Sequence, residues 1–296
     1  MRVLVIGGTG YVGIPVVQAL VRAGHVVFAL ARTQEKAKQL AAEEATPVLG
    51  DISDVDSWIH LIPTLDVVVD IQGGMFGVGT ALFQAVKKEV LRTRADGPKL
   101  AYIMTSGTWV HGDDRKEVVT DTTPTPNPIN FSAWRVPVEK EVTSDTVLNG
   151  IVIRPSIVYG RSGGACFSPL FEGASKGKVE WFGTPGGRYS VVHLDDLADL
   201  YLRVAEKSQM LGGQIFDAAN PLSESVDDLL QKMVEVSGAK GPYKYGAQPP
   251  NPLFEGIQTT TMLRPYLGRT LVDWVPKKPG LIDGLPVWYA SWQASQ

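Results

Sequence analysis

Apolar residues in the first half of the chain alternate between short continuous runs and longer segments with a helical period. The continuous runs predict buried strands over residues 3–6, 26–31, 46–49, 66–71, 100–105 and 151–153. The periodic segments between them predict helices over residues 11–23, 34–44, 79–94 and 136–148. Because helices that alternate with buried strands connect parallel strands, this pattern predicts an α/β fold with a doubly wound parallel sheet.

The pattern changes after residue 159, where glycine, proline and aromatic residues become frequent. A helix over residues 195–207 and a strand over residues 214–217 are expected to return to the sheet. We therefore predict two interleaved parts. Residues 1–155 and 189–220 form the sheet domain, and residues 156–188 and 221–296 form a smaller C-terminal lobe that binds the substrate.

Glycines cluster where the first predicted strand passes into the first predicted helix. Gly7, Gly10 and Gly13 have the spacing G-x-x-G-x-x-G. This spacing suits a tight turn, close approach of the backbone to a pyrophosphate, and a helix N-terminus directed at its charge. The sequence therefore predicts a dinucleotide-binding Rossmann sheet, with Tyr11 and Val12 also in contact with the cofactor.

The end of the second predicted strand indicates which dinucleotide binds. An NAD site usually has an acidic residue there, which hydrogen-bonds the ribose 2′-hydroxyl. Arg32 stands in that place, and its guanidinium can pair with a 2′-phosphate, so the sequence favours NADP(H). Asp51 and Ile52 follow the third predicted strand and are expected to flank the adenine, with Asp51 accepting from its amino group.

Composition and charge narrow the class of partner. The 296 residues carry a net charge of −3 without a basic run, which argues against nucleic acid and leaves a small-molecule substrate. No segment has the roughly 18 uncharged apolar residues of a membrane span, and the first strand begins too early for a signal peptide. Cys166 is the single cysteine, which excludes an internal disulfide framework. A cytoplasmic location is expected.

Four further segments carry recognisable motifs. They are residues 105–112 (TSGTWVHG), 154–160 (RPSIVYG), 191–198 (VVHLDDLA) and 267–276 (LGRTLVDWVP). Together with the glycine loop, they resemble the extended short-chain dehydrogenase/reductases, the NAD-dependent epimerase/dehydratase family. The resemblance implies an active site between a Rossmann domain and a C-terminal substrate lobe, with Pro155 among the cofactor-binding residues. It also implies a fold that commonly forms homodimers.

In such enzymes a tyrosine transfers the hydroxyl proton and a lysine four residues later holds the ribose. This chain departs from that pattern. With Glu139 in register, Phe131 stands at the tyrosine position and Arg135 at the lysine position. Phenylalanine has no proton to transfer, whereas arginine keeps its charge and can hold ribose hydroxyls. Arg135 is therefore a candidate cofactor-binding and catalytic residue.

The serine or threonine that orients the substrate oxygen in the family is also displaced. Gly107 stands at its position, between Ser106 and Thr108, and His111 takes the place of a family tyrosine. The candidate groups for donating the proton or orienting the substrate are Thr105, Ser106, Thr108, His111 and Tyr159.

Two functional hypotheses remain. In the first, the protein is an NADPH-dependent reductase of a small organic carbonyl or enone with a non-standard proton donor, since hydride transfer depends mainly on the cofactor and on positioning. The glycine loop also resembles that of isoflavone and phenylcoumaran benzylic ether reductases, which lack the usual tyrosine. In the second, Phe131 marks the loss of redox chemistry, and the NADP-binding fold acts as a lyase, isomerase, cyclase or redox-sensing binding protein. No metal site is expected, because His193, Asp195 and Asp196 precede a predicted helix, where such residues cap the first turn.

Overall fold

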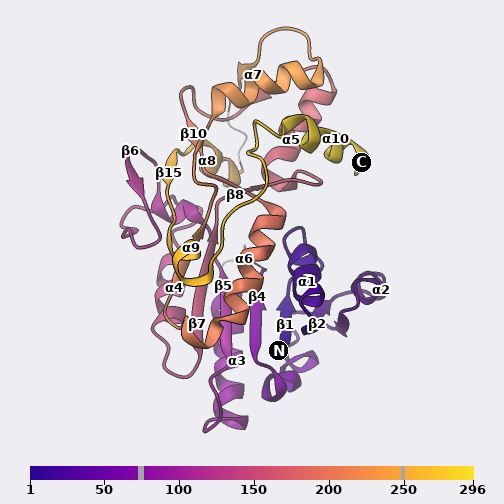
Figure 1. The fold of residues 1–296 in the computed structure, drawn as a ribbon, viewed down its shortest axis with the longest axis vertical. Helices are drawn as coiled ribbons and strands as arrows, with labels where there is room; N and C mark the ends of the chain where they lie inside the picture. Colours follow the sequence, from indigo (N-terminus) through magenta and orange to yellow (C-terminus); the bar gives the residue numbers. More distant parts are fainter. Residues whose placement is uncertain (73–76, 248–250) are drawn as a thin grey trace.

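A seven-stranded parallel sheet forms the centre of the molecule in the computed structural model, which describes residues 1–72, 77–247 and 251–296 (Figure 1). The strands follow the order β12-β7-β5-β4-β1-β2-β3, and all neighbouring pairs are parallel. In chain order they are β1 (Arg2–Ile6), β2 (Val26–Ala31), β3 (Thr46–Leu49), β4 (Val67–Asp70), β5 (Ala101–Thr105), β7 (Asn149–Pro155) and β12 (Ile215–Ala218). The doubly wound parallel fold predicted from the sequence is confirmed.

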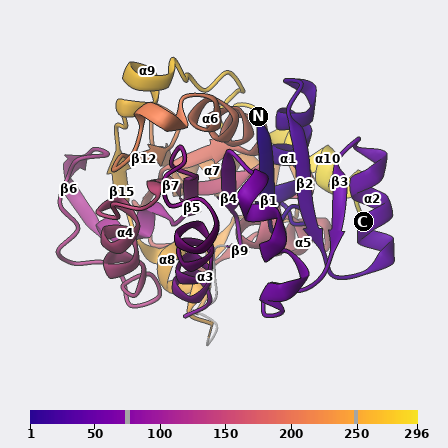
Figure 2. The ribbon, with the colours of Figure 1, turned by 90° about the horizontal axis from the view of Figure 1, so that it is seen from below.

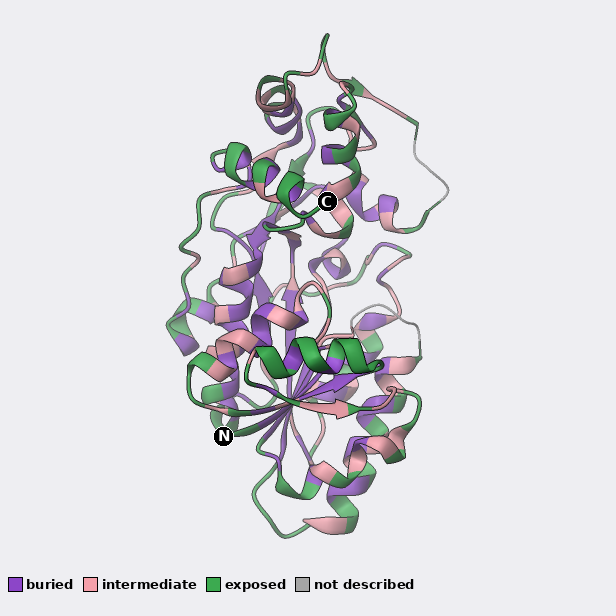
Figure 3. Ribbon diagram, turned by 90° about the vertical axis from the view of Figure 1, so that its right-hand side faces the viewer, coloured by how far each residue is buried: buried purple, intermediate pink, exposed green. Residues whose placement is uncertain are grey.

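Helices cover both faces of this sheet (Figure 2). One face carries α1 (Gly13–Arg22), α2 (Gln34–Ala42) and α6 (Leu194–Glu206), and the other carries α3 (Val78–Thr93) and α4 (Arg135–Thr143). Alternate strand residues supply two separate cores: Val3 and Val5 pack with α1 and α6, whereas Leu4 and Ile6 pack with α3. Figure 3 shows the central strands buried between the helices. Burial on both faces explains why each strand is a continuous apolar run.

A smaller lobe occupies the upper end of the molecule in Figure 1. Its helices are α5 (Gly164–Ser175), α7 (Val226–Ser237), α8 (Leu253–Gln258) and α10 (Leu285–Ala294). Its short strands pair as β9 (Glu180–Trp181) with β14 (Lys244–Tyr245), and as β10 (Arg188–Tyr189) with β13 (Glu224–Ser225). The lobe has its own core, in which Phe167, Trp181 and Leu230 are fully buried.

Two strand pairs and one helix connect the lobe to the sheet domain. The pairs are β8 (Ile157–Tyr159) with β11 (Val191–His193), and β6 (Asp114–Val119) with β15 (Thr261–Leu263). The helix α9 (Leu267–Val272) packs in the core beside α6, and the Trp274 indole donates a 2.8 Å hydrogen bond to Asp196 O. Val272 and Trp274, which the predicted boundaries place in the lobe, thus pack against the sheet domain.

Short 3-10 helices occur in the connections. They are η1 (Val55–Ser57), η2 (Ile59–Thr64), η3 (Thr108–His111) and η4 (Ser208–Met210). Among the residues that the structure describes, no helix combines the length and the apolar character needed to cross a membrane.

The predicted helix over residues 136–148 ends several residues early in the structure. The periodic segment 136–148 is helical only to Thr143, within α4. The Asp145 carboxylate accepts hydrogen bonds from the backbone N–H groups of Val147 at 2.8 Å and Leu148 at 2.9 Å. Such an aspartate turn competes with the helical backbone pattern, so the apolar residues after it lead into β7 instead.

Candidate active site

Two cavities lie where the carboxyl ends of the central strands meet, and the glycine loop lines both. In a doubly wound sheet this edge, where the strand order reverses between β1 and β4, is the usual ligand site. The first cavity has a volume of about 330 Å³. Five of the predicted cofactor residues line it together: Gly7, Gly10, Arg32, Asp51 and Ile52. Asp51 accepts hydrogen bonds from Ser53 N and Oγ, which lower the pKa of its carboxyl.

The three glycines of the loop have different structural roles. Gly7 has φ +86°, a conformation that side-chain-bearing residues rarely adopt. A Cβ on Gly13 would lie 2.0 Å from Gly7 O, so this glycine permits α1 to pack against the loop. A Cβ on Gly10 would meet only Gly7 O, at 3.3 Å, because Gly10 borders the cavity. No described side chain caps the N-terminus of α1, which leaves its positive end available to an anion.

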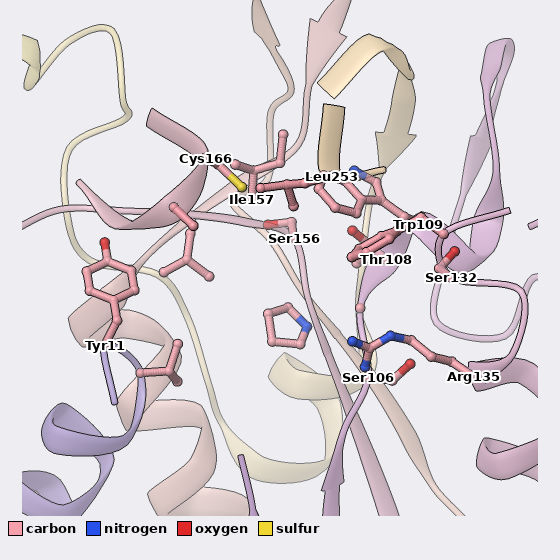
Figure 4. Close-up of a pocket in the computed structure, with 16 residues that line it drawn as sticks. Tyr11, Ser106, Thr108, Trp109, Ser132, Arg135, Ser156, Ile157, Cys166 and Leu253 are labelled. Atoms are coloured by element: carbon pink, nitrogen blue, oxygen red, sulfur yellow. The ribbon is translucent and has the colours of Figure 1, made fainter. Parts of the chain in front are cut away.

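The second cavity, of about 290 Å³, lies between the sheet domain and the lobe (Figure 4). Tyr11 of the glycine loop reaches it on one side, and Arg135 enters from the opposite side. Val12 also lines it. The predicted residues Ser106, Thr108 and Pro155 also line it. The rest of its wall is mainly apolar and aromatic: Trp109, Phe131, Ile157, Val158, Ala165 and Leu253. The structure thus brings six of the predicted site residues around one space: Tyr11, Val12, Ser106, Thr108, Arg135 and Pro155.

The hydroxyl groups in this cavity differ in what they can offer a ligand. The Ser106 hydroxyl donates a hydrogen bond to the Glu139 carboxylate, so toward a ligand its oxygen can only accept. The Ser156 hydroxyl is buried and has no hydrogen-bond partner among the described residues. Thr108 lines the same wall and is 4% exposed. Burial raises the pKa of Cys166 to about 12, which keeps this thiol neutral.

Phe131 and Arg135 both line the second cavity; Phe131 lies in the turn before α4, and Arg135 is the first residue of α4. Arg135 is 6% exposed, and its Nη1 donates one hydrogen bond, to Thr105 O at 3.3 Å. Its guanidinium also lies 4.7 Å from the centre of the Trp134 ring. Burial lowers the pKa of Arg135, and nearby carboxylates oppose this effect. A positive charge therefore stands beside a phenylalanine that can exchange no proton.

A buried ionic network lies behind this cavity. Glu139 accepts from Arg154 Nη2 at 2.5 Å, and Arg154 Nη1 lies 3.6 Å from Asp217 Oδ1. His111 Nε2 lies 2.8 Å from Asp217 Oδ2, with both side chains fully buried. The structure therefore directs His111 toward the network, and the residue does not line either cavity beside the glycine loop.

Tyr159, the other predicted proton donor, faces the lobe. Its hydroxyl donates to Pro279 O at 2.6 Å and accepts from Asn220 Nδ2 at 3.2 Å. Burial raises the pKa of Tyr159 well above its ordinary value. Its neighbours Ile157 and Val158 line the second cavity and Tyr159 does not.

Sequence reasoning missed several residues of the site. Ser156 directly follows Pro155 at the end of β7, a position that could have marked it as a site residue. Gln72 follows β4 at the same edge of the sheet and lines the first cavity. Leu253 comes from the lobe helix α8, and no local pattern connects it to the glycine loop.

His193 and Asp196 hydrogen-bond to backbone N–H groups. His193 Nδ1 accepts from Asp195 N at 3.0 Å and thereby caps α6. Asp196, predicted as another cap, instead accepts from the backbone N–H groups of Lys277 and Lys278, both at 3.0 Å. It anchors the returning C-terminal segment, which local sequence spacing could not indicate.

The buried carboxyl of Asp70, at the end of β4, makes the free energy of unfolding depend on pH. Burial raises the pKa of its carboxyl to about 6, although hydrogen bonds from Tyr102 and Gln72 N oppose the shift. The folded protein therefore holds this proton more tightly than the unfolded chain, and stability falls as pH rises from about 4 to 6. We therefore compare the change in unfolding free energy that Asp70→Asn causes at two pH values. This change should be about 2–3 kcal/mol more favourable at about pH 8 than at about pH 4.

Urea unfolding of both proteins at the two pH values checks this expectation. Asp56→Asn, at an exposed position, is the matched control and should show the same effect at both. An Asp70→Asn effect that does not change with pH would contradict the prediction.

Comparison with known proteins extends these observations. The model of the NAD dependent epimerase/dehydratase family matches residues 3–219. The chain is 28% identical over 230 residues to an uncharacterized protein of Schizosaccharomyces pombe, with 74% of each chain covered. It is 24% identical over 295 residues to a Stigmatella aurantiaca protein, covering 92% of this chain and 82% of that one. That relative is 4-hydroxy-2-methyl-3-oxo-4-farnesyl-3,4-dihydroquinoline-1-oxide ketoreductase. A 96-residue part, 29% of the chain, is 34% identical to isoflavone reductase homolog A622 of Nicotiana tabacum, of which it covers 31%.

Solved structures share the fold across the whole chain. The UDP-glucose 4-epimerase of Thermotoga maritima with UDP-glucose has a TM-score of 0.79 at 18% identity, covering 100% of this chain and 99% of that one. The human epimerase family protein SDR39U1 with NADPH has a TM-score of 0.77 at 17% identity, covering 98% and 99%. Since the family model spans well over half of the sequence, the chain belongs to the NAD dependent epimerase/dehydratase family.

Proposed function

We propose that the protein is an NADPH-dependent reductase of a small, mainly apolar carbonyl compound or enone. Membership of an NAD-dependent family supports a nicotinamide dinucleotide cofactor, and a structural neighbour contains NADPH. The ketoreductase and isoflavone reductase relatives support reductase chemistry. The sheet domain would hold the cofactor, and the lobe would complete the substrate site.

The two cavities suit the two halves of such a cofactor. Arg32, Asp51 and Ile52 would hold the adenosine half in the first cavity, while the glycine loop and the uncapped end of α1 would receive the pyrophosphate. The open space beside Gly10 supports this fit, because a side chain there would fill it. Pro155 and Arg135 would lie beside the nicotinamide half in the second cavity. When bound there, the nicotinamide supplies the hydride.

The observation that carries the substrate class is the lining of the second cavity. Among the described residues that line it, Arg135 is the sole charged side chain, and aromatic and aliphatic groups form most of the wall. A nucleotide sugar carries a pyrophosphate and many hydroxyls, which such a wall would leave unpaired. A small apolar compound with a single carbonyl oxygen fits it better.

Phe131 keeps a second candidate function open. Without a tyrosine at this position, the same fold could bind NADP(H) as a redox-sensing protein, or act as a lyase, isomerase or cyclase. Incubation with NADPH and a panel of ketones, aldehydes, enones and quinones distinguishes the two. Loss of the near-ultraviolet absorbance of NADPH with any compound supports the reductase. Tight NADPH binding without turnover on the whole panel supports the second candidate.

The cofactor preference rests on Arg32. We expect Arg32→Met to weaken NADPH binding about thirtyfold and to leave NADH binding within about twofold, because only NADPH carries a 2′-phosphate for the guanidinium. Titration of the nicotinamide fluorescence measures both affinities. Arg92→Met, which removes an exposed arginine of α3, is the control and should change neither. A wild-type protein that binds NADH more tightly, or an equal loss for both cofactors, would refute the NADP preference.

A further inference from the structure

Arg135 has more N–H donors than it has hydrogen-bond acceptors among the described residues. A guanidinium has five N–H donors, and burying it is costly unless oxygen atoms satisfy them. Arg135 as a whole residue is 6% exposed, and within the described part of the chain its guanidinium makes one hydrogen bond, to the backbone oxygen of Thr105. Among the described residues, no carboxylate lies within 4 Å of it. Most of its N–H donors therefore have no partner among the described residues, and the group borders the second cavity.

The surrounding carboxylates are engaged elsewhere. Glu139 is held by Arg154 and accepts the Ser106 proton. Asp70 accepts from Tyr102 and from a backbone N–H group. Trp134 supports the guanidinium from its ring face, which fixes the position of the charge without using its in-plane N–H donors.

We propose, resting on the reductase function above, that Arg135 binds the substrate carbonyl oxygen and holds it as an oxyanion during the reaction. As hydride adds to the β-carbon of an enone, the C=C π pair shifts to form a double bond between the α-carbon and the carbonyl carbon, and the C=O π pair moves to oxygen. The enolate oxygen is then paired with the Arg135 N–H groups. A solvent proton later adds at the α-carbon, so that enone, NADPH and one proton yield the saturated ketone and NADP⁺.

This arrangement selects among carbonyl compounds. Arginine stays protonated, so it stabilises an oxyanion by charge and does not deliver a proton. Hydride addition to an isolated ketone forms a strongly basic alkoxide, which requires a proton donor such as the tyrosine that Phe131 replaces. Hydride addition to a conjugated enone or a quinone forms a delocalised, weakly basic anion, which a fixed positive charge can hold. The substrate class is therefore an enone or quinone rather than an isolated ketone.

A binding test separates this role from catalysis. The probe is 4-nitrophenol, whose phenolate resembles a delocalised enolate and changes absorbance on ionisation. In the presence of NADP⁺, we expect the bound probe to have an apparent pKa about one unit or more below that of the free probe. Arg135→Met should remove this shift and weaken phenolate binding about tenfold or more, whereas Arg135→Lys should retain part of both. Lys140→Met removes an exposed charge from the same helix and should change neither.

The outcomes distinguish this inference from the proposed function. The role of Arg135 would be overturned if the wild type bound 4-nitrophenolate and its neutral methyl ether equally well. It would also be overturned if the pKa shift of bound 4-nitrophenol were unchanged in Arg135→Met. Loss of NADPH affinity with the phenolate shift intact would assign Arg135 to the ribose and also overturn it. Reduction of isolated ketones as fast as enones would leave the reductase function standing but refute the selectivity. Absence of turnover on every compound would refute the function, while a shift dependent on Arg135 would still support the oxyanion site.

Discussion

Arg154→Met is expected to lower the free energy of unfolding by about 3–5 kcal/mol, because it leaves two buried carboxylates without their shared positive partner. The side chains of Arg154, Glu139 and Asp217 are 4%, 3% and 0% exposed. Arg154 donates from Nε to Glu139 Oε1 at 3.1 Å and from Nη2 to Oε2 at 2.5 Å. Desolvated charges of this kind are individually costly, so the removal of one partner affects stability more than the net value of the pair.

Urea unfolding at neutral pH measures the loss. Lys176→Met is the control, because Lys176 and Glu172 form an exposed pair at the C-terminal end of α5, with side chains 68% and 60% exposed. The control should change stability by less than about 0.5 kcal/mol. The double variant Arg154→Met with Glu139→Gln should recover part of the loss by removing one of the stranded charges. A single-variant effect no larger than that of Lys176→Met would show that the network does not support the fold.

The sequence predicts the central sheet well for a physical reason. Strands buried on both faces need continuous apolar runs, and β2 and β3 have the bounds that the sequence predicts. The end of α4 is different, because the Asp145 turn interrupts a periodic apolar pattern that continues through it. In the lobe, strands of two residues have no pattern to detect, although α7 begins at a capping serine, Ser225, and ends at Gly238.

In the candidate site, too, local sequence spacing predicts the position of some residues and not of others. Gly7, Gly10, Arg32 and Asp51 follow strand ends, and parallel strands end at one edge, so local spacing is enough to place them together. For His111 and Tyr159 the sequence indicates suitable chemistry but not the direction of the side chain. His111 faces Asp217 and Tyr159 faces the lobe, because each side chain hydrogen-bonds to a partner far along the chain.

Gly13 and Gly10 belong to the same loop but have different neighbours. Gly13→Ala is expected to destabilise the fold by about 3 kcal/mol and to abolish measurable NADPH binding, because its Cβ would lie 2.0 Å from Gly7 O and 2.8 Å from Gly8 Cα. Both contacts are backbone atoms, so α1 must move away from β1, and Val16 and Val17 would lose their packing in the core.

Gly10→Ala tests the cavity without disturbing the helix. Its Cβ would meet only Gly7 O at 3.3 Å and its φ is not in the left-handed region, so unfolding free energy should change by less than about 1 kcal/mol. The same Cβ would enter the first cavity where the pyrophosphate is expected, and NADPH affinity should fall about tenfold or more. Urea unfolding and NADPH fluorescence titration on the two variants separate packing from binding. Equal stability of the two variants, or full NADPH affinity in Gly10→Ala, would mean that the loop does not hold the pyrophosphate in this way.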